Sequence, residues 1–296
     1  MRLIVIGCLV LLTSCYQEVD IDLPAREAKL VVSSFITTSD VVEVNVGQTQ
    51  ASSDTLYSIE GDCQVKLESN QSVHKLKKVR QGVYQSDFKP EYLVPYKVTV
   101  VADGYDTVWA KDSIPMPISF TIGRYIPTAN INYEGENVSS IVILLENIPK
   151  DDSFFELRLK SHNAIEVDGV VRQDYNYEYI YSKDIIFRNE GVVNETESRV
   201  GLLFTNELID TPNRSVTIEF FNDIDDEYNA IDEVEVELRT VSYSYFMYKK
   251  KLYLNIDNQV GDVWDATGNP VEAFTNIHNG YGIVAGYSQV ARAKLL

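Results

Sequence analysis

The chain has 296 residues, of which 45% are apolar, and its formal charge is −18. This apolar content is enough for one large or two medium domains with cores of their own. A surface this acidic repels nucleic acid and anionic lipid headgroups. The composition therefore argues against a nucleic-acid-binding role.

Residues 1–14 have the pattern of a secretory signal peptide that ends in a bacterial lipobox. Residues 3–12 form an apolar run, which Leu12-Thr13-Ser14-Cys15 closes. The run is too short for a transmembrane helix, which needs about 20 apolar residues, and the run before Cys8 is shorter still. We therefore predict cleavage before Cys15 and a covalent lipid on its sulfur, with no other cofactor.

Residues 15–28 form an acidic tether after this cysteine. Two or more acyl chains hold a protein stably on a membrane, so we expect a folded body that is tethered to a membrane by its lipid. Acidic residues directly after a lipidated cysteine resemble the surface-export signal of Bacteroidota lipoproteins, which implies display on the cell surface. A solvated acidic linker is the alternative. The acidic residues are Glu18, Asp20, Asp22 and Glu27.

Most of the remaining sequence alternates apolar and polar residues with a period of two. This period is typical of antiparallel sheets with one buried and one solvated face. The clearest runs are residues 42–46, 96–100, 155–160, 215–220 and 233–239. Residues 242–256 also fit helical spacing, with a strand as the alternative. We therefore predict a mainly β protein with at most one or two short helices.

Two prolines with one residue between them mark a domain boundary at residues 113–117, because this pattern favours extended, unpaired backbone. Residues 29–112 hold enough candidate strands for an antiparallel sandwich of immunoglobulin-like or transthyretin-like type. Residues 118–296 form a longer β-rich region with wider gaps between strands. We predict an N-terminal β-sandwich, a proline-containing linker and a second β-rich domain.

A row of tyrosines is the best candidate for a ligand surface. On a strand, alternate residues share one face, and tyrosine rings can stack on a sugar or on another flat apolar ligand. Cross-strand packing is the alternative, since tyrosine favours strands and its hydroxyl tolerates water. The row consists of Tyr175, Tyr177, Tyr179 and Tyr181.

An acidic cluster follows the run at residues 215–220. Hard cations such as Ca²⁺ take several oxygens from one loop, but the spacing lacks the glycine and the distal glutamate of a calcium-binding loop. A solvated turn is the preferred interpretation, and we assign no metal site. The weak candidates for metal ligands are Asp223, Asp225, Asp226 and Glu227.

The sequence indicates no catalytic residue. His74, His162 and His278 do not form a pair with zinc-site spacing, and no nucleophile elbow or phosphate loop occurs. Separated residues can still assemble a site, so these absences lower the expectation of an enzyme without excluding one.

Several short segments occur in a defined order along nearly the whole chain. They are Cys15 with Glu18–Pro24, Lys29-Leu30-Val31-Val32, Gly82-Val83-Tyr84, Tyr96–Val100 with Gly104-Tyr105, Ile114-Pro115, and Asn276-Ile277 with Asn279–Ile283. Together they resemble a Bacteroidota outer-membrane lipoprotein family, catalogued as domain of unknown function 4249. The resemblance implies a β-rich outer-membrane lipoprotein that is encoded beside TonB-dependent receptors. It carries over no catalytic residues.

Three functions fit these observations. The first is a non-enzymatic binding or accessory subunit of a TonB-dependent receptor system, with a glycan or peptide as the ligand. The second is a structural or adhesive surface protein, such as a pilus-like subunit that exchanges strands through a sheet edge. The third, and the least supported, is a surface hydrolase, which would need carboxylates or a nucleophile gathered in one place.

Overall fold

The computed structural model describes residues 27–49, 59, 61–70, 72–132, 135–167, 170–188, 200–222, 231, 233–259 and 271–296. These residues are mostly strands, so the predicted mainly β class is confirmed. They hold one α-helix, α2 (Tyr243–Gln259), at the place where the helical spacing predicts it, and one short 3₁₀ turn, η1 (Ile185–Phe187). The predicted signal peptide, Cys15 and most of the tether lie outside the described residues.

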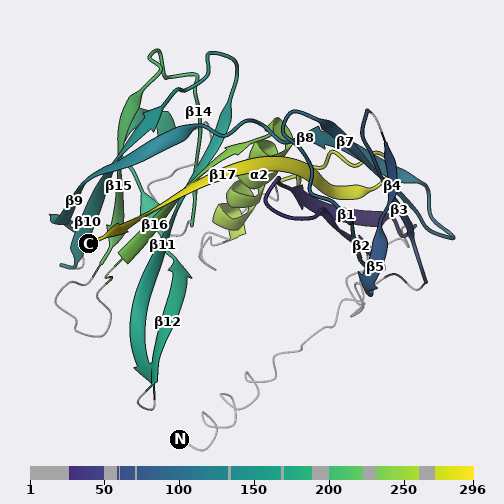
Figure 1. Cartoon of the computed structure of the whole chain (residues 1–296), viewed down its shortest axis with the longest axis horizontal. Helices are drawn as coiled ribbons and strands as arrows, with labels where there is room; N and C mark the ends of the chain where they lie inside the picture. The colour runs from purple at the N-terminus through teal and green to yellow at the C-terminus, as the bar shows by residue number, and fades with distance from the viewer. Residues whose placement is uncertain are drawn as a thin grey trace, which may run out of the picture.

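The first half of the chain forms a β-sandwich around a core of its own (Figure 1). Alternate residues such as Val32, Val44 and Val98 are buried between its two sheets, as the period of two predicts. One sheet contains β1 (Leu30–Ile36), β2 (Glu43–Gln48), β6 (Val83–Gln85) and β5 (Lys77–Arg80), in that order. The other contains β4 (Val73–Lys75), β3 (Gln64–Glu68), β7 (Pro95–Val101) and β8 (Val108–Ser113).

The second half forms another sandwich around a second core, with Phe120, Phe155 and Ile218 fully buried in it. One sheet is built from β12 (Val170–Tyr177), β11 (Phe154–Val167) and β16 (Glu233–Val241), and β14 (Leu202–Thr205) also pairs with β11. The facing sheet contains β13 (Ile180–Tyr181), β15 (Arg214–Phe221), β10 (Asn137–Glu146) and β9 (Ser119–Ile131).

One long strand, β17 (Tyr281–Leu295), belongs to both sandwiches. Residues 281–286 pair with β1, from Val31 opposite Tyr281 to Ile36 opposite Gly286. Residues 287–295 pair with β16. The strand thereby joins one sheet from each sandwich into a single nine-stranded sheet, and Figure 1 shows it as the yellow ribbon that runs from one half to the other.

The pairing of β17 with β1 is parallel, whereas every other pair of named strands is antiparallel within the described residues. Glycines allow the close approach of backbones that this crossing needs. Gly282 has a φ of +109°, and a Cβ atom there would lie 2.0 Å from the carbonyl oxygen of Val32. A Cβ atom at Gly286 would lie 2.2 Å from the carbonyl oxygen of Ser113. A larger residue at either position therefore clashes with backbone.

Helix α2 packs where the two sandwiches meet. It forms a third apolar cluster with Ile283 and Ala285 of β17 and Val241 of β16, and Tyr245 lies edge-on to Phe35 of β1 at 5.5 Å between ring centroids. Ser242 caps the helix, because its hydroxyl accepts a hydrogen bond from the Tyr245 N–H at 3.2 Å. No helix among the described residues is both long and apolar enough to cross a membrane.

Residues 114–118 lead from the first sandwich to the second. Ile114 is buried, and its carbonyl accepts a hydrogen bond from the Leu93 N–H at 2.8 Å. The Ile118 N–H donates to the hydroxyl of Thr240 at 3.3 Å, and β9 begins at the next residue. The core of the first sandwich also contains Ile277 and Val284, which lie outside the predicted first domain of residues 29–112. The domain boundaries stay a prediction.

Candidate functional site

Opposite charges face one another across β11 and β16. The register places Glu156 opposite Arg239, Arg158 opposite Glu237, and Lys160 opposite Glu235. Oppositely charged residues that lie directly across from each other stabilise an antiparallel pair. The alternate residues of the two strands, including Phe155 and Leu238, fill the core of the second sandwich. The charges therefore lie on the outer face of that sheet.

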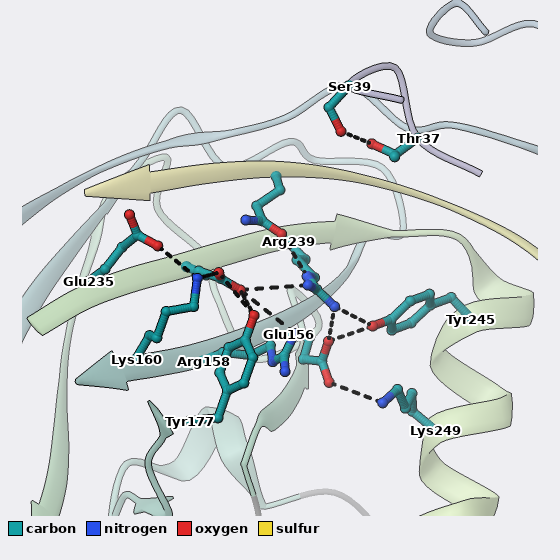
Figure 2. A network of polar contacts seen from close by, with 12 residues as sticks. Thr37, Ser39, Glu156, Arg158, Lys160, Tyr177, Glu235, Arg239, Tyr245 and Lys249 are labelled. Atoms are coloured by element: carbon teal, nitrogen blue, oxygen red, sulfur yellow. Dashed lines mark hydrogen bonds and ion pairs between the residues drawn. The ribbon is translucent and has the colours of Figure 1, made fainter. Parts of the chain in front are cut away.

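This outer face holds an extended set of polar contacts, which we call the charge network (Figure 2). Helix α2 contributes to it from one side and β12 from the other. Its members are Glu156, Arg158, Lys160, Tyr177, Glu235, Glu237, Arg239, Tyr245, Lys249 and Tyr253.

Two carboxylates of the charge network are fully buried, which corrects the prediction that this face is solvated. The side chains of Glu156 and Glu237 are only 1% and 2% exposed. Helix α2 packs against β11 and covers Glu156, while long cationic side chains and the Tyr177 hydroxyl surround Glu237. The alternation of polar residues identified the strands correctly, but it does not show which polar side chains another element covers.

Glu156 lies at the end of the network nearest α2. It accepts hydrogen bonds from the hydroxyls of Tyr245 at 2.6 Å and Tyr253 at 3.3 Å. Arg239 lies 3.4 Å away and Lys249 3.9 Å away. A buried charge is tolerated only when it has partners of this kind. A Cβ atom at Gly201 would lie 2.9 Å from the carboxylate, so this position leaves little room for a side chain.

Glu237 lies between three cations. Its carboxylate contacts Lys160 at 3.0 Å, Arg239 at 3.6 Å and Arg158 at 3.7 Å, and it accepts a hydrogen bond from the Tyr177 hydroxyl at 3.2 Å. Partial burial by itself lowers the pKa of Lys160, but its hydrogen bonds to Glu237 and Glu235 outweigh this effect and raise the pKa to about 12. Lys160 is therefore a cation at neutral pH.

Tyr245 links Arg239 to Glu156. Arg239 donates a hydrogen bond to the tyrosine oxygen at 3.0 Å, and the hydroxyl in turn donates to Glu156. Burial, followed by the negative charge of Glu156, raises the pKa of Tyr245 well above its ordinary value. The hydroxyl thus stays protonated and keeps donating to the carboxylate.

The structure separates the four predicted tyrosines. Tyr175 and Tyr177 are exposed on β12, whereas Tyr181 lies on β13 in the facing sheet, paired with Glu219 of β15. The chain leaves β12 after Tyr177, and the exposed Tyr179 lies between the two strands. The ring of Tyr175 lies edge-on to the ring of His162, with 4.6 Å between the ring centroids. The guanidinium carbon of Arg158 lies over the Tyr177 ring, 3.7 Å from its centroid. The ligand platform stays a prediction, now centred on two tyrosines.

The acidic cluster of Asp223, Asp225, Asp226 and Glu227 lies outside the described residues, as does Cys15. Among the residues that the structure does describe, no three histidine, cysteine or acidic side chains come together in a way that could hold a metal ion.

Sequence reasoning missed the charge network itself. One signal was available, because the charges of residues 156–160 and 235–239 are complementary when the two runs are read antiparallel. The contributions of Tyr245, Lys249 and Tyr253 had no such signal, since they depend on where α2 packs.

The family model described as Domain of unknown function (DUF4249) matches residues 16–293. The chain belongs to this family. No curated protein matches the chain. Among solved structures, the chitinase ChiA74 from Bacillus thuringiensis is 11% identical over 65% of this chain, with a TM-score of 0.17. The chain spans only 25% of that chitinase, and a likeness this weak supports no argument about function.

Several residues that carried the resemblance to the DUF4249 family hold β17 in place. The Asn276 side chain donates to the Val284 carbonyl at 2.7 Å and accepts from its N–H at 3.0 Å. A Cβ atom at Gly280 would lie 2.6 Å from the carbonyl oxygen of Leu30, and Gly282 makes the close approach to Val32 described above. These residues serve the crossing of β17 between the sandwiches.

Proposed function

We propose that this protein is a lipid-anchored, non-enzymatic binding subunit of the outer membrane that works with a TonB-dependent receptor. The lipobox Leu12-Thr13-Ser14-Cys15 carries the proposal, because only an extracytoplasmic anchored protein needs it. Membership of the DUF4249 family agrees with this assignment, through the receptor association that the resemblance implies.

The geometry of the two sandwiches supports a binding role. The strand β17 and the helix α2 tie both halves together, which suits a body that presents a surface to a partner. The buried carboxylates Glu156 and Glu237 are occupied by hydroxyl and cationic partners, so neither is free to act as a general acid or base. Because these two carboxylates already have partners, they do not support the hydrolase alternative.

Purification under gentle detergent tests the proposal. We expect the wild-type protein, tagged at its C-terminus and expressed in its own host, to bring a receptor barrel with it from outer membranes. The matched control is Cys15→Ser, which removes the acylated sulfur; we expect it to lack fatty acid by mass spectrometry and to leave the membrane fraction. Recovery of the acylated wild-type protein alone would count against the receptor association.

The structural or adhesive alternative requires an open sheet edge that accepts a strand from another molecule. One edge strand of the nine-stranded sheet, β5, carries the exposed charges of Lys77, Lys78 and Arg80 over a short length. Exposed lysines on a short edge strand hinder strand addition at that edge. If the purified protein formed a ladder of oligomers, this alternative would regain support.

A further inference from the structure

Arg158 lacks a hydrogen-bond acceptor within the described part of the chain, although its side chain is only 14% exposed. Its Nε is buried without a partner, and the carboxylate of Glu237 lies 3.7 Å from Nη1, which is beyond hydrogen-bonding distance. The guanidinium carbon lies 3.7 Å from the centroid of the Tyr177 ring, which fixes its position. The N–H donors of this guanidinium therefore have a defined place but no hydrogen-bond acceptor among the described residues, and Nε is also shielded from water.

Lys249 is the second cation with an incomplete set of partners. Its ammonium is 3.9 Å from Glu156 and makes no hydrogen bond to any described residue, while its side chain is 25% exposed. Burial lowers the pKa of Lys249, and the nearby positive charges of Arg158 and Arg239 add to this effect against the opposing charge of Glu156. An ammonium is costly in these surroundings unless an anion comes to it.

The charge network also contains one more cation than it has carboxylates. Arg158, Lys160, Arg239 and Lys249 are opposed by three glutamates. Glu156 and Glu237 are already shared among several donors, which Figure 2 shows for Glu156. A single added negative charge beside Arg158 and Lys249 would balance the network.

The neighbouring side chains indicate what kind of molecule would bring this charge. A guanidinium matches a planar carboxylate through two parallel hydrogen bonds. The exposed ring of Tyr177 lies beside Arg158 on the adjacent strand and offers flat surface for a sugar ring. Because the whole chain carries a formal charge of −18, a polyanion would be repelled, which favours a ligand with one carboxylate.

We propose that Arg158 and Lys249 bind the carboxylate of an acidic saccharide, such as one uronic acid unit, whose ring packs against Tyr177 of β12. This assignment rests on the proposed function of a binding subunit and gives that function a ligand class. The carboxylate supplies the acceptor that each of these cations lacks among the described residues.

Saturation-transfer NMR and titration with glucuronate and glucose test the assignment, because these two sugars share a ring and differ only at carbon 6. We expect wild-type protein to bind glucuronate at least about tenfold more tightly than glucose, as loss of a charge-assisted hydrogen bond implies. Lys249→Met and Arg158→Gln should each weaken glucuronate binding by about tenfold or more and leave glucose unchanged. Lys250→Met, a change at the next lysine of α2, should have no effect.

Thermal unfolding of each variant separates binding from stability. Lys249→Met removes one of the cations near the buried Glu156, so we expect it to lower the unfolding temperature. Binding is therefore measured well below the unfolding transition of each variant, so that a loss of binding does not result from unfolding. Equal binding of the two sugars, or no binding of either, would overturn the assignment. Tighter binding of triglutamate than of glucuronate would assign the two cations to an acidic peptide instead. None of these results affects the receptor co-purification, which tests the binding-subunit proposal independently.

Discussion

Tyr245 is a buried side chain whose main polar role is to donate to Glu156 while accepting from Arg239. We predict that Tyr245→Phe lowers the free energy of unfolding by about 2 kcal/mol, because hydrogen bonds to charged groups contribute about 1.5–3 kcal/mol each. Urea unfolding measures the change. Tyr243→Phe is the matched control on the same helix, since the Tyr243 side chain is exposed. Equal losses for the two variants would contradict the role given to the Tyr245 hydroxyl.

Asp112 joins β8 to the start of α2 by accepting hydrogen bonds from the Ser242 hydroxyl and the Ser113 N–H, each at 2.7 Å. Burial raises its pKa above the ordinary 3.8, despite the hydrogen bonds that oppose this effect. The native state therefore binds this proton more tightly than the unfolded state does. As pH falls from neutral towards 3.8, protonation should stabilise the wild type relative to Asp112→Asn.

Unfolding free energies of wild type and Asp112→Asn, measured in urea from pH 7 to pH 4, test this sign. A difference between the two proteins that stays constant over this range, or that moves in favour of the variant on acidification, would show that Asp112 is not destabilised by its burial.

At the scale of single elements, the alternation of residues was a reliable guide to strands. Phe155, Leu157 and Leu159 are buried in the second core, and their polar neighbours lie on the opposite face. The same alternation could not show that Glu156 is covered, because its partners on α2 come from 89 to 97 residues later in the chain. Whether a polar face is buried depends on how the elements pack against one another. The alternation of residues within one strand carries no information about that packing.

The tyrosine row shows a second limit of sequence periodicity. A period of two places Tyr175 and Tyr177 together on β12, and the structure agrees. The pattern continues through Tyr181, but the chain crosses to the facing sheet before this residue, where Tyr181 lies on β13 and pairs with β15. Periodicity alone does not mark where a strand ends if the residues after it keep the same alternation.

The glycines of β17 give a prediction at the level of this element. Gly282→Ala should lower the free energy of unfolding by more than about 2 kcal/mol, because it combines strain at positive φ with a clash against the Val32 backbone. Gly104→Ala is the control, since Gly104 also has a positive φ, +82°, but has open space where the Cβ atom would lie. We expect it to cost only about 1 kcal/mol.

Chemical denaturation of both glycine variants provides the comparison. If Gly104→Ala were as destabilising as Gly282→Ala, backbone conformation alone would explain the loss, and the close approach of β17 to β1 would contribute nothing.

At the scale of the whole molecule, the shared strand predicts that the two sandwiches unfold together. Leu67→Ala in the first core and Ile218→Ala in the second should each cost about 2–5 kcal/mol, as truncation of buried residues does. Since β17 and α2 belong to both halves, we expect calorimetry to show one transition, which each substitution shifts as a whole. Two heat-absorption peaks, each moved by only one substitution, would mean that the halves are independent.

The parallel pairing of β17 with β1 also governs when the protein can reach its native state. A ribosome completes β1 roughly 250 residues before it reaches residues 281–286 of the partner strand, so this edge of β1 stays unpaired while the residues between them are synthesised. The sheet of the first sandwich cannot complete its native pairing until residues 281–286 have been made. Truncation of the chain just before Tyr281 should consequently be as damaging as a much earlier truncation.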